Sequence, residues 1–62
     1  MMLKELLDTP GLDFADRLSV TIDYYTFTST VKALRVFYGH YTVVEFHVPC
    51  GSMMIDSVVI VK

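Results

Sequence analysis

Apolar and polar side chains alternate along the stretch 32–48, KALRVFYGHYTVVEFHV. A period of two places successive side chains on opposite faces of an extended chain, so this stretch predicts two strands. Gly39 lies between the two runs, where a hairpin turn needs a residue that tolerates positive φ. We therefore expect a central β-hairpin between residues 32 and 48, around which the rest of the chain is organised.

The length of the turn decides which side chains share a face. A two-residue loop, Tyr38–Gly39 or Gly39–His40, mixes apolar and charged side chains on both faces. A three-residue loop of Tyr38, Gly39 and His40 separates them, and register follows burial. The predicted inner face then holds Leu34, Val36, Val44, Phe46 and Val48, and the outer face holds Arg35, Glu45 and His47.

The N-terminal residues 2–8 predict a short helix. Leu3, Leu6 and Leu7 fall at i, i+3 and i+4, which places them on one helix face. A helix this short holds only when it is docked on the rest of the chain. The next residues, Thr9-Pro10-Gly11, either end this helix or begin a further helical turn with Thr9 as its N-cap. Both alternatives are open at this point.

The remaining segments predict further strands. Residues 18–27, LSVTIDYYTF, are rich in β-branched and aromatic residues and alternate with a period of two. Residues 28–30 then form a turn into the central hairpin, and Pro49 and Gly51 suit a turn after it. Asp56 and Ser57 divide the last apolar run into strands 53–55 and 58–61. The sequence therefore predicts a mostly β domain over residues 1–62, with a short N-terminal helix and a five-stranded, strongly bent antiparallel meander.

The chain is more apolar than one small core requires. Of its 62 residues, 53% are hydrophobic and 19% are charged, whereas a chain of this size buries only about 60% of its unfolded surface. Self-association is the simplest way to cover the remainder. No apolar run approaches the roughly 18 residues of a membrane span, and the N-terminus has no secretory signal pattern. We expect no membrane partner.

The net charge of −2 gives no electrostatic footprint for nucleic acid. Any such binding depends on local cations, namely Lys32, Arg35 or Lys62, repeated by oligomer symmetry. Cys50 is the single cysteine, so an intrachain disulfide is impossible and a cytoplasmic location is expected.

Few residues have the spacing of catalytic or metal sites. His47 and Cys50 offer two metal ligands, where a structural zinc ion needs four. The carboxylates show no spacing typical of an acid–base pair, and no activated serine or cysteine is evident. We therefore expect that the protein is not an enzyme and that it binds neither a metal ion nor a cofactor.

Aromatic residues surround the predicted central turn. The rings of Tyr38, His40 and Tyr41 can stack on nucleic-acid bases, which contributes roughly 1–3 kcal/mol per base. The same rings can instead cap the hairpin or pack in a subunit interface.

Three segments carry a family resemblance. Residues 37–44, FYGHYTVV, are similar to the aromatic loop and following strand of the first Sm motif. Residues 52–61, SMMIDSVVIV, are similar to the second motif, and 19–25 resembles the family's first strand. Over about residues 10–61 the chain thus resembles Sm-like RNA-binding proteins of the Hfq type, which implies a small Sm-like or SH3-like β-barrel. It departs from them at 31–34, which lack a strand glycine, at Gly39 in place of Asp, and at Ile55-Asp56 in place of a basic turn.

The resemblance also implies a homo-oligomeric ring of five to seven subunits that binds single-stranded RNA or DNA. The fourth strand of one subunit would pair with the fifth strand of the next. The implied interface residues are Met53, Met54, Ile55, Val58, Val59, Ile60 and Val61. The implied nucleic-acid-binding residues, which lie around the pore, are Tyr38, Gly39, His40, Tyr41 and Ser57.

Two functions are compatible with this sequence. The element order and the aromatic loop favour the ring-forming nucleic-acid binder. The acidic charge balance and the missing basic turn favour a protein–protein adaptor or inhibitor on the same β scaffold, of the kind that phages and mobile elements encode.

The apolar excess generates a prediction about solution mass. Because open β-edges and uncovered apolar surface favour pairing, we expect a homo-oligomer of about five to seven copies. Light scattering at micromolar concentration measures this directly. A mass near that of one chain would show that the apolar surface is covered within the monomer.

Overall fold

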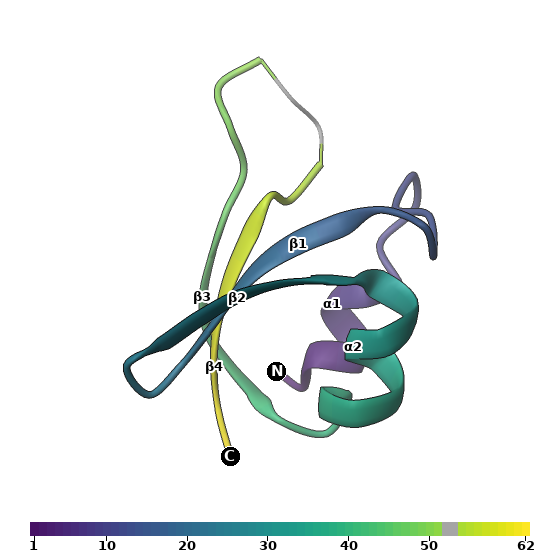
Figure 1. Ribbon diagram of the computed structural model, residues 1–62. Coiled ribbons are helices and arrows are strands. Elements are labelled where there is room, and N and C mark those ends of the chain that lie inside the picture. The colour runs from purple at the N-terminus through teal and green to yellow at the C-terminus, as the bar shows by residue number, and fades with distance from the viewer. Residues whose placement is uncertain (52–53) are drawn as a thin grey trace.

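The computed structural model describes residues 1–51 and 54–62 (Figure 1). Within these residues the chain is mostly β, with a short N-terminal helix as the sequence predicts and a second helix between two pairs of strands. The elements are α1 (Leu3–Leu7), β1 (Arg17–Ile22), β2 (Tyr25–Thr30), α2 (Val31–Tyr38), β3 (Thr42–His47) and β4 (Ser57–Val61).

The strands form one mixed sheet with the order β2-β1-β4-β3. β1 pairs antiparallel with β2, and β3 pairs antiparallel with β4. Where the two pairs meet, β1 and β4 run parallel, with Val20 opposite Val58 and Ile22 opposite Ile60. α2 follows β2 directly and carries the chain across to β3, at the other edge of the sheet. The parallel pairing in the centre of the sheet is therefore made by the first and the last strand in chain order.

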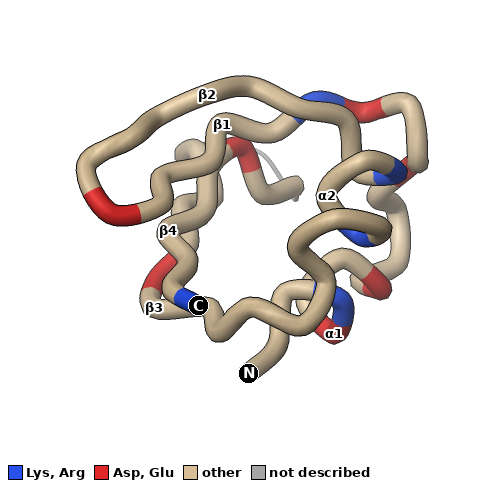
Figure 2. Tube along the Cα trace, turned by 60° about the horizontal axis from the view of Figure 1, so that its bottom comes forward, with Lys and Arg blue, Asp and Glu red and all other residues tan. Residues whose placement is uncertain are grey.

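The hydrophobic core lies between the sheet and the two helices, which cover the same face of the sheet (Figures 1 and 2). On β1 and β2 the opposite face carries small polar side chains, among them Thr21 and Thr26, whose hydroxyl oxygens lie 3.1 Å apart. Burial on one face only matches the alternation within β1. The buried core residues are Leu3, Leu6, Leu7, Leu18, Val20, Val31, Leu34, Ile55, Val58 and Ile60.

The predicted N-terminal helix is confirmed as α1, and its leucines lie in the core. The backbone N–H of Met2 donates to a carboxylate oxygen of Glu5 at 2.9 Å, which satisfies a donor at the helix start. At the other end, the Thr9 hydroxyl donates to the carbonyl oxygen of Leu6 at 2.6 Å. Thr9 therefore lies just after the end of α1. The residues that follow it form a single turn, in which the N–H of Leu12 donates to the carbonyl oxygen of Thr9 at 3.3 Å, and not a second helix.

The central hairpin predicted for residues 32–48 is wrong in its first half, because 31–38 form α2. Thr30 caps this helix, since its side-chain oxygen accepts from the N–H of Ala33 at 3.2 Å. Val31, Leu34 and Tyr38 recur at i, i+3 and i+7, so one helix face meets the core. The short run KALRVFY is compatible with the two-residue period of a strand and with the 3.6-residue period of a helix. Packing against α1 and the sheet favours the helix.

Gly39 also has a different role from the one predicted. Its φ is −56°, so no positive φ is needed there. Instead the residue is buried against α1, where its carbonyl oxygen accepts from the N–H of Lys4 at 2.8 Å. A side chain at this position would collide with the carbonyl of Arg35 and press on the Lys4 side chain. Glycine therefore permits the close approach of α1 and the end of α2.

The single strand predicted for residues 18–27 is divided into β1 and β2 by a two-residue turn at Asp23 and Tyr24. Asp23 adopts φ 55°, in the left-handed region that Asp tolerates better than most residues. The turn places Ile22 opposite Tyr25. Residues 28–30, predicted as a turn, are the end of β2.

The five-stranded antiparallel barrel is likewise not what the chain forms in its described residues. The sheet is open, its central pair is parallel, and strand 58–61 corresponds to β4 in the sheet interior. Ile55 is buried but lies outside any strand, and Met53 lies outside the described residues. Because β4 is already paired with β1 and β3, its backbone is occupied within the chain. The assignment of residues 53–55 and 58–61 to a subunit interface stays a prediction.

Helices α1 and α2 are both too short to cross a lipid bilayer, and no other helix occurs in the described residues.

The position of Val58 generates a stability prediction. This side chain is 1% exposed, whereas Val61 on the same strand is 40% exposed. Val58→Asp places an unpaired charge in the core and should cost at least about 3 kcal/mol, enough to unfold much of a chain this small. Val61→Asp is the matched control, with an expected cost below about 1 kcal/mol. Urea denaturation followed by circular dichroism measures both, and equal stability of the two variants would contradict the described core.

Candidate functional site

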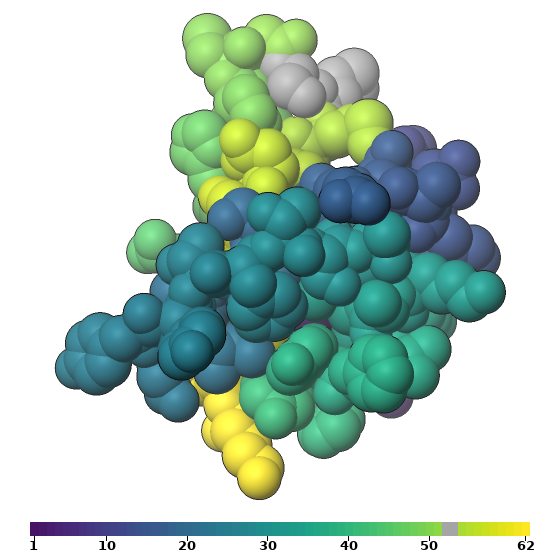
Figure 3. Space-filling model, viewed as in Figure 1, coloured from purple at the N-terminus to yellow at the C-terminus, as the bar shows by residue number. Residues whose placement is uncertain are grey.

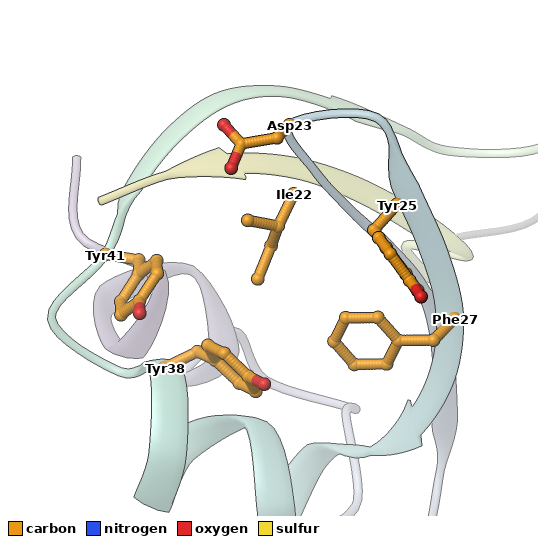
Figure 4. A pocket seen from close by; sticks show the side chains of 6 residues that line it. All are labelled: Ile22, Asp23, Tyr25, Phe27, Tyr38 and Tyr41. Atoms are coloured by element: carbon orange, nitrogen blue, oxygen red, sulfur yellow. The ribbon is translucent and has the colours of Figure 1, made fainter.

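An open pocket of about 410 Å³ lies between the turn that joins β1 to β2 and the C-terminal end of α2. Figure 4 shows side chains from these segments arranged around a shared hollow. The turn itself projects from the body of the molecule (Figure 3, left). The lining residues are Ile22, Asp23, Tyr25, Phe27, Tyr38 and Tyr41.

The sheet register positions one wall of the pocket. Tyr25 is paired with Ile22, and Phe27 is paired with Val20, so these side chains lie on the core face of the sheet. Beyond the end of the helical cover, this face is no longer closed by α1 and α2. Tyr25 is accordingly exposed, whereas Ile22 and Phe27 are half-buried. The pocket is thus an extension of the core that solvent reaches.

The end of α2 provides the other wall. Tyr38 is the last residue of the helix, and the N–H of Tyr41 donates to its carbonyl oxygen at 3.0 Å. This turn brings the ring of Tyr41 back beside Tyr38. The ring centroids lie 5.2 Å apart with an interplanar angle of 81°, the edge-to-face arrangement that aromatic pairs favour.

Tyr38 also joins the two walls. Its ring centroid lies 5.8 Å from that of Phe27, with an interplanar angle of 46°. A chain of ring contacts therefore runs from Phe27 on β2 through Tyr38 on α2 to Tyr41 in the following loop. These contacts pack the three rings against one another along one side of the hollow.

Among the described residues, Asp23 is the only charged one that lines the pocket. Its carboxylate forms no hydrogen bond or ion pair with any residue in 1–51 or 54–62. In Figure 2 the turn between β1 and β2 is acidic, and the basic positions lie elsewhere on the chain. The pocket is therefore aromatic with a negative rim.

The structure brings together two of the residues that the sequence selects for nucleic acid. Tyr38 and Tyr41 share the pocket, and His40 contacts Tyr41 from outside it, with centroids 5.3 Å apart. Gly39 is buried against α1. Ser57 begins β4 and is paired with Ser19, near the opposite end of β1 from the pocket. The predicted set does not form one site.

Sequence reasoning missed the half of the pocket contributed by the first strand pair. The alternation over residues 18–27 predicts one continuous strand, in which neighbouring residues face opposite ways. That strand includes Ile22, Asp23, Tyr25 and Phe27. The available signal was Asp23-Tyr24, because Asp favours turns and tolerates positive φ. Reading a turn there places Tyr25 beside Ile22.

Other titratable side chains are scattered over the described chain. His47 contacts Asp56 through Nδ1 and Oδ1 at 2.9 Å, and both side chains are exposed. Asp8 pairs with Arg35 across α1 and α2, also at the surface. Cys50 is exposed and free. No group of three or more His, Cys, Asp or Glu side chains gathers anywhere in residues 1–51 and 54–62.

Comparisons of the chain with protein-family models, with curated proteins and with solved structures give no match. The geometry and chemistry of the pocket therefore carry the functional argument.

The ring contacts generate a stability prediction. Tyr38→Ala removes a half-buried ring that touches both walls of the pocket, and should cost about 2 kcal/mol of unfolding free energy. Tyr24→Ala is the matched control, since Tyr24 lies fully exposed at the nearby turn. Urea denaturation of the two variants gives the comparison. A Tyr38→Ala protein as stable as the control would mean that the rings do not pack together in solution.

Proposed function

We propose that this chain is a non-enzymatic adaptor module that receives one side chain of a partner protein in its aromatic pocket. The observation that carries the proposal is the convergence of four aromatic rings from β2, α2 and the following loop on one open pocket of about 410 Å³. Pockets of roughly 300–1,000 Å³ with apolar and aromatic walls are typical ligand sites.

The chemistry of the lining favours binding over catalysis. Its polar groups are three tyrosine hydroxyls and one carboxylate, without a nucleophile–base pair at hydrogen-bond distance. Tyrosine and phenylalanine offer large contact areas with few rotatable bonds, so they lose little entropy on binding. Such rings are typical of the anchors that dominate protein–protein interfaces. This matches the adaptor alternative that the acidic charge balance favours.

Tyr25, which lines the pocket, is followed at the rim by its exposed neighbour Tyr24. Tyr24 is fully exposed and Tyr25 is 79% exposed. They lie at the projecting turn beside the pocket, where a segment that leads into or out of the hollow would pass. A partner that inserts one side chain would therefore gain further aromatic contact at the rim.

Single-stranded nucleic acid is the second candidate ligand, and the clustering of Tyr38, His40 and Tyr41 favours it. Bases stack on such rings with little sequence preference. Against this candidate, the lining holds a carboxylate and no Lys or Arg, whereas nucleic-acid affinity rests largely on cations.

Self-association into the expected homo-oligomer is part of the same proposal. Val36 and Phe37 on α2 are each 68% exposed, and Val44 on β3 is 59% exposed. Apolar side chains of this size on a small surface support association with further copies.

Titration with capped single amino acids tests the adaptor function. N-acetyl amides of Trp, Leu, Met, Arg and Glu are added to ¹⁵N-labelled protein, and amide shifts are followed by NMR. We expect millimolar binding of at least one compound, with the largest shifts at Ile22, Tyr25, Tyr38 and Tyr41, because one side chain fills the pocket without the rest of an interface.

A parallel titration separates the two candidate functions. Labelled U-rich and A-rich oligomers are added at low salt, and fluorescence anisotropy is measured. Oligomer binding that weakens as salt rises, combined with no shift of the pocket amides by any amino acid, would replace the adaptor function with the nucleic-acid function.

A further inference from the structure

We propose that the pocket selects an organic cation on an apolar stem: a guanidinium or alkylated ammonium head group, as on an arginine or methylated lysine side chain. This inference rests on the adaptor function proposed above and names the chemistry of the side chain that the pocket accepts. It follows from two properties of the lining, its aromatic faces and its single unpaired carboxylate.

The aromatic walls favour a positive charge over a neutral group of the same shape. An aromatic ring carries negative potential on its face, so a cation within about 6 Å of the centroid is attracted. The centroids of Phe27, Tyr38 and Tyr41 follow one another at 5.8 and 5.2 Å. The three rings pack against one another and line the same hollow, so a head group in the hollow lies beside more than one ring (Figure 4).

Asp23 supplies the complementary charge. Its side chain stands at the rim of the hollow, above Ile22 (Figure 4). The turn holds it there, since the left-handed φ of 55° is fixed by the hairpin on either side. Because no described residue pairs with this carboxylate, a ligand cation meets it without displacing another partner.

No Lys or Arg of the described residues lines the pocket. Arg35 is paired with Asp8 at the molecular surface. Lys62 follows β4 at the same end of the sheet as Asp23, but it is not part of the lining. A negative rim without an internal counter-ion repels carboxylates and phosphates, so the charge of the pocket complements only a cation.

Hydration ranks the possible head groups. A primary ammonium is strongly hydrated and carries three N–H donors, yet the rim offers a single carboxylate. Guanidinium and quaternary ammonium groups are less strongly hydrated, so they lose less on entering an aromatic pocket. We therefore expect trimethyl-lysine and arginine to bind more tightly than unmodified lysine.

An NMR titration with matched probes tests this inference on the intact chain. The probes are the N-acetyl amides of trimethyl-lysine, arginine and lysine, and the neutral analogue of trimethyl-lysine with a tert-butyl head group. We expect trimethyl-lysine to bind about three- to thirtyfold more tightly than its neutral analogue, as cation–π contacts imply. Tetramethylammonium chloride is added separately. Binding as tight as that of trimethyl-lysine would identify a free small cation, and weaker binding would identify a side chain.

Two variants assign the effect to the pocket. Asp23→Asn keeps the shape and tolerates the same φ, and should weaken trimethyl-lysine about two- to fivefold. Glu45→Gln removes the same charge from β3, on the sheet face opposite the core and the pocket. This variant should leave the affinity for trimethyl-lysine unchanged. Phe27→Leu removes a pocket ring and should weaken binding, whereas Phe14→Leu removes an exposed ring outside the pocket and should not.

The outcomes separate this inference from the function on which it rests. If the neutral analogue binds as tightly as trimethyl-lysine and both shift the pocket amides, the cation inference is overturned and the adaptor function stands. If no probe and no capped amino acid shifts these amides, both are overturned. Equal weakening by Asp23→Asn and Glu45→Gln, with dispersed spectra for both variants, would show that only the net charge matters.

Discussion

The parallel contact between β1 and β4 is the interaction on which the rest of this small structure depends. It joins strands that lie about forty residues apart along the chain and pairs Val20 with Val58 and Ile22 with Ile60, all on the core face. Without it, the β1–β2 hairpin would be an isolated two-stranded element, which is marginal in water. The closing of this long loop costs entropy that the buried valines and isoleucines must offset. The helices then cover the face that this contact creates.

The pocket forms because the two helices cover only part of the core face of the sheet. α2 buries Val31 and Leu34, and it ends at Tyr38, where Gly39 lets the chain pass close against α1. The core face of the sheet continues past this point to Ile22 and Tyr25. The uncovered end is lined by rings, because the residues that begin β2 and end α2 are mostly aromatic. One arrangement thus produces both a closed core and an adjoining open site.

The charges of the chain are distributed in keeping with this site. Arg35 and Asp8 tie the two helices together at the surface, and His47 and Asp56 bridge the two ends of the loop between β3 and β4. Exposed pairs of this kind contribute little stability. Asp23 is different, since the hairpin turn holds it beside the rings and no described residue pairs with it. A chain with net charge −2 that presents an aromatic pocket with an acidic rim is better suited to cations than to phosphates.

The sequence by itself determined those helices and strands whose residue pattern is compatible with one secondary structure only. The leucine spacing predicted α1, because one face of that helix is buried, and the apolar run 58–61 predicted a strand, which lies within β4. Residues 31–38 were different, since so short a run fits both a strand and a helix, and only the Thr30 cap and burial of Leu34 decide. Tyr38 and Tyr41 were selected from their neighbourhood in sequence, but Tyr25 and Phe27 were not. What joins these four rings is strand pairing and helix packing between distant segments, which no local pattern encodes.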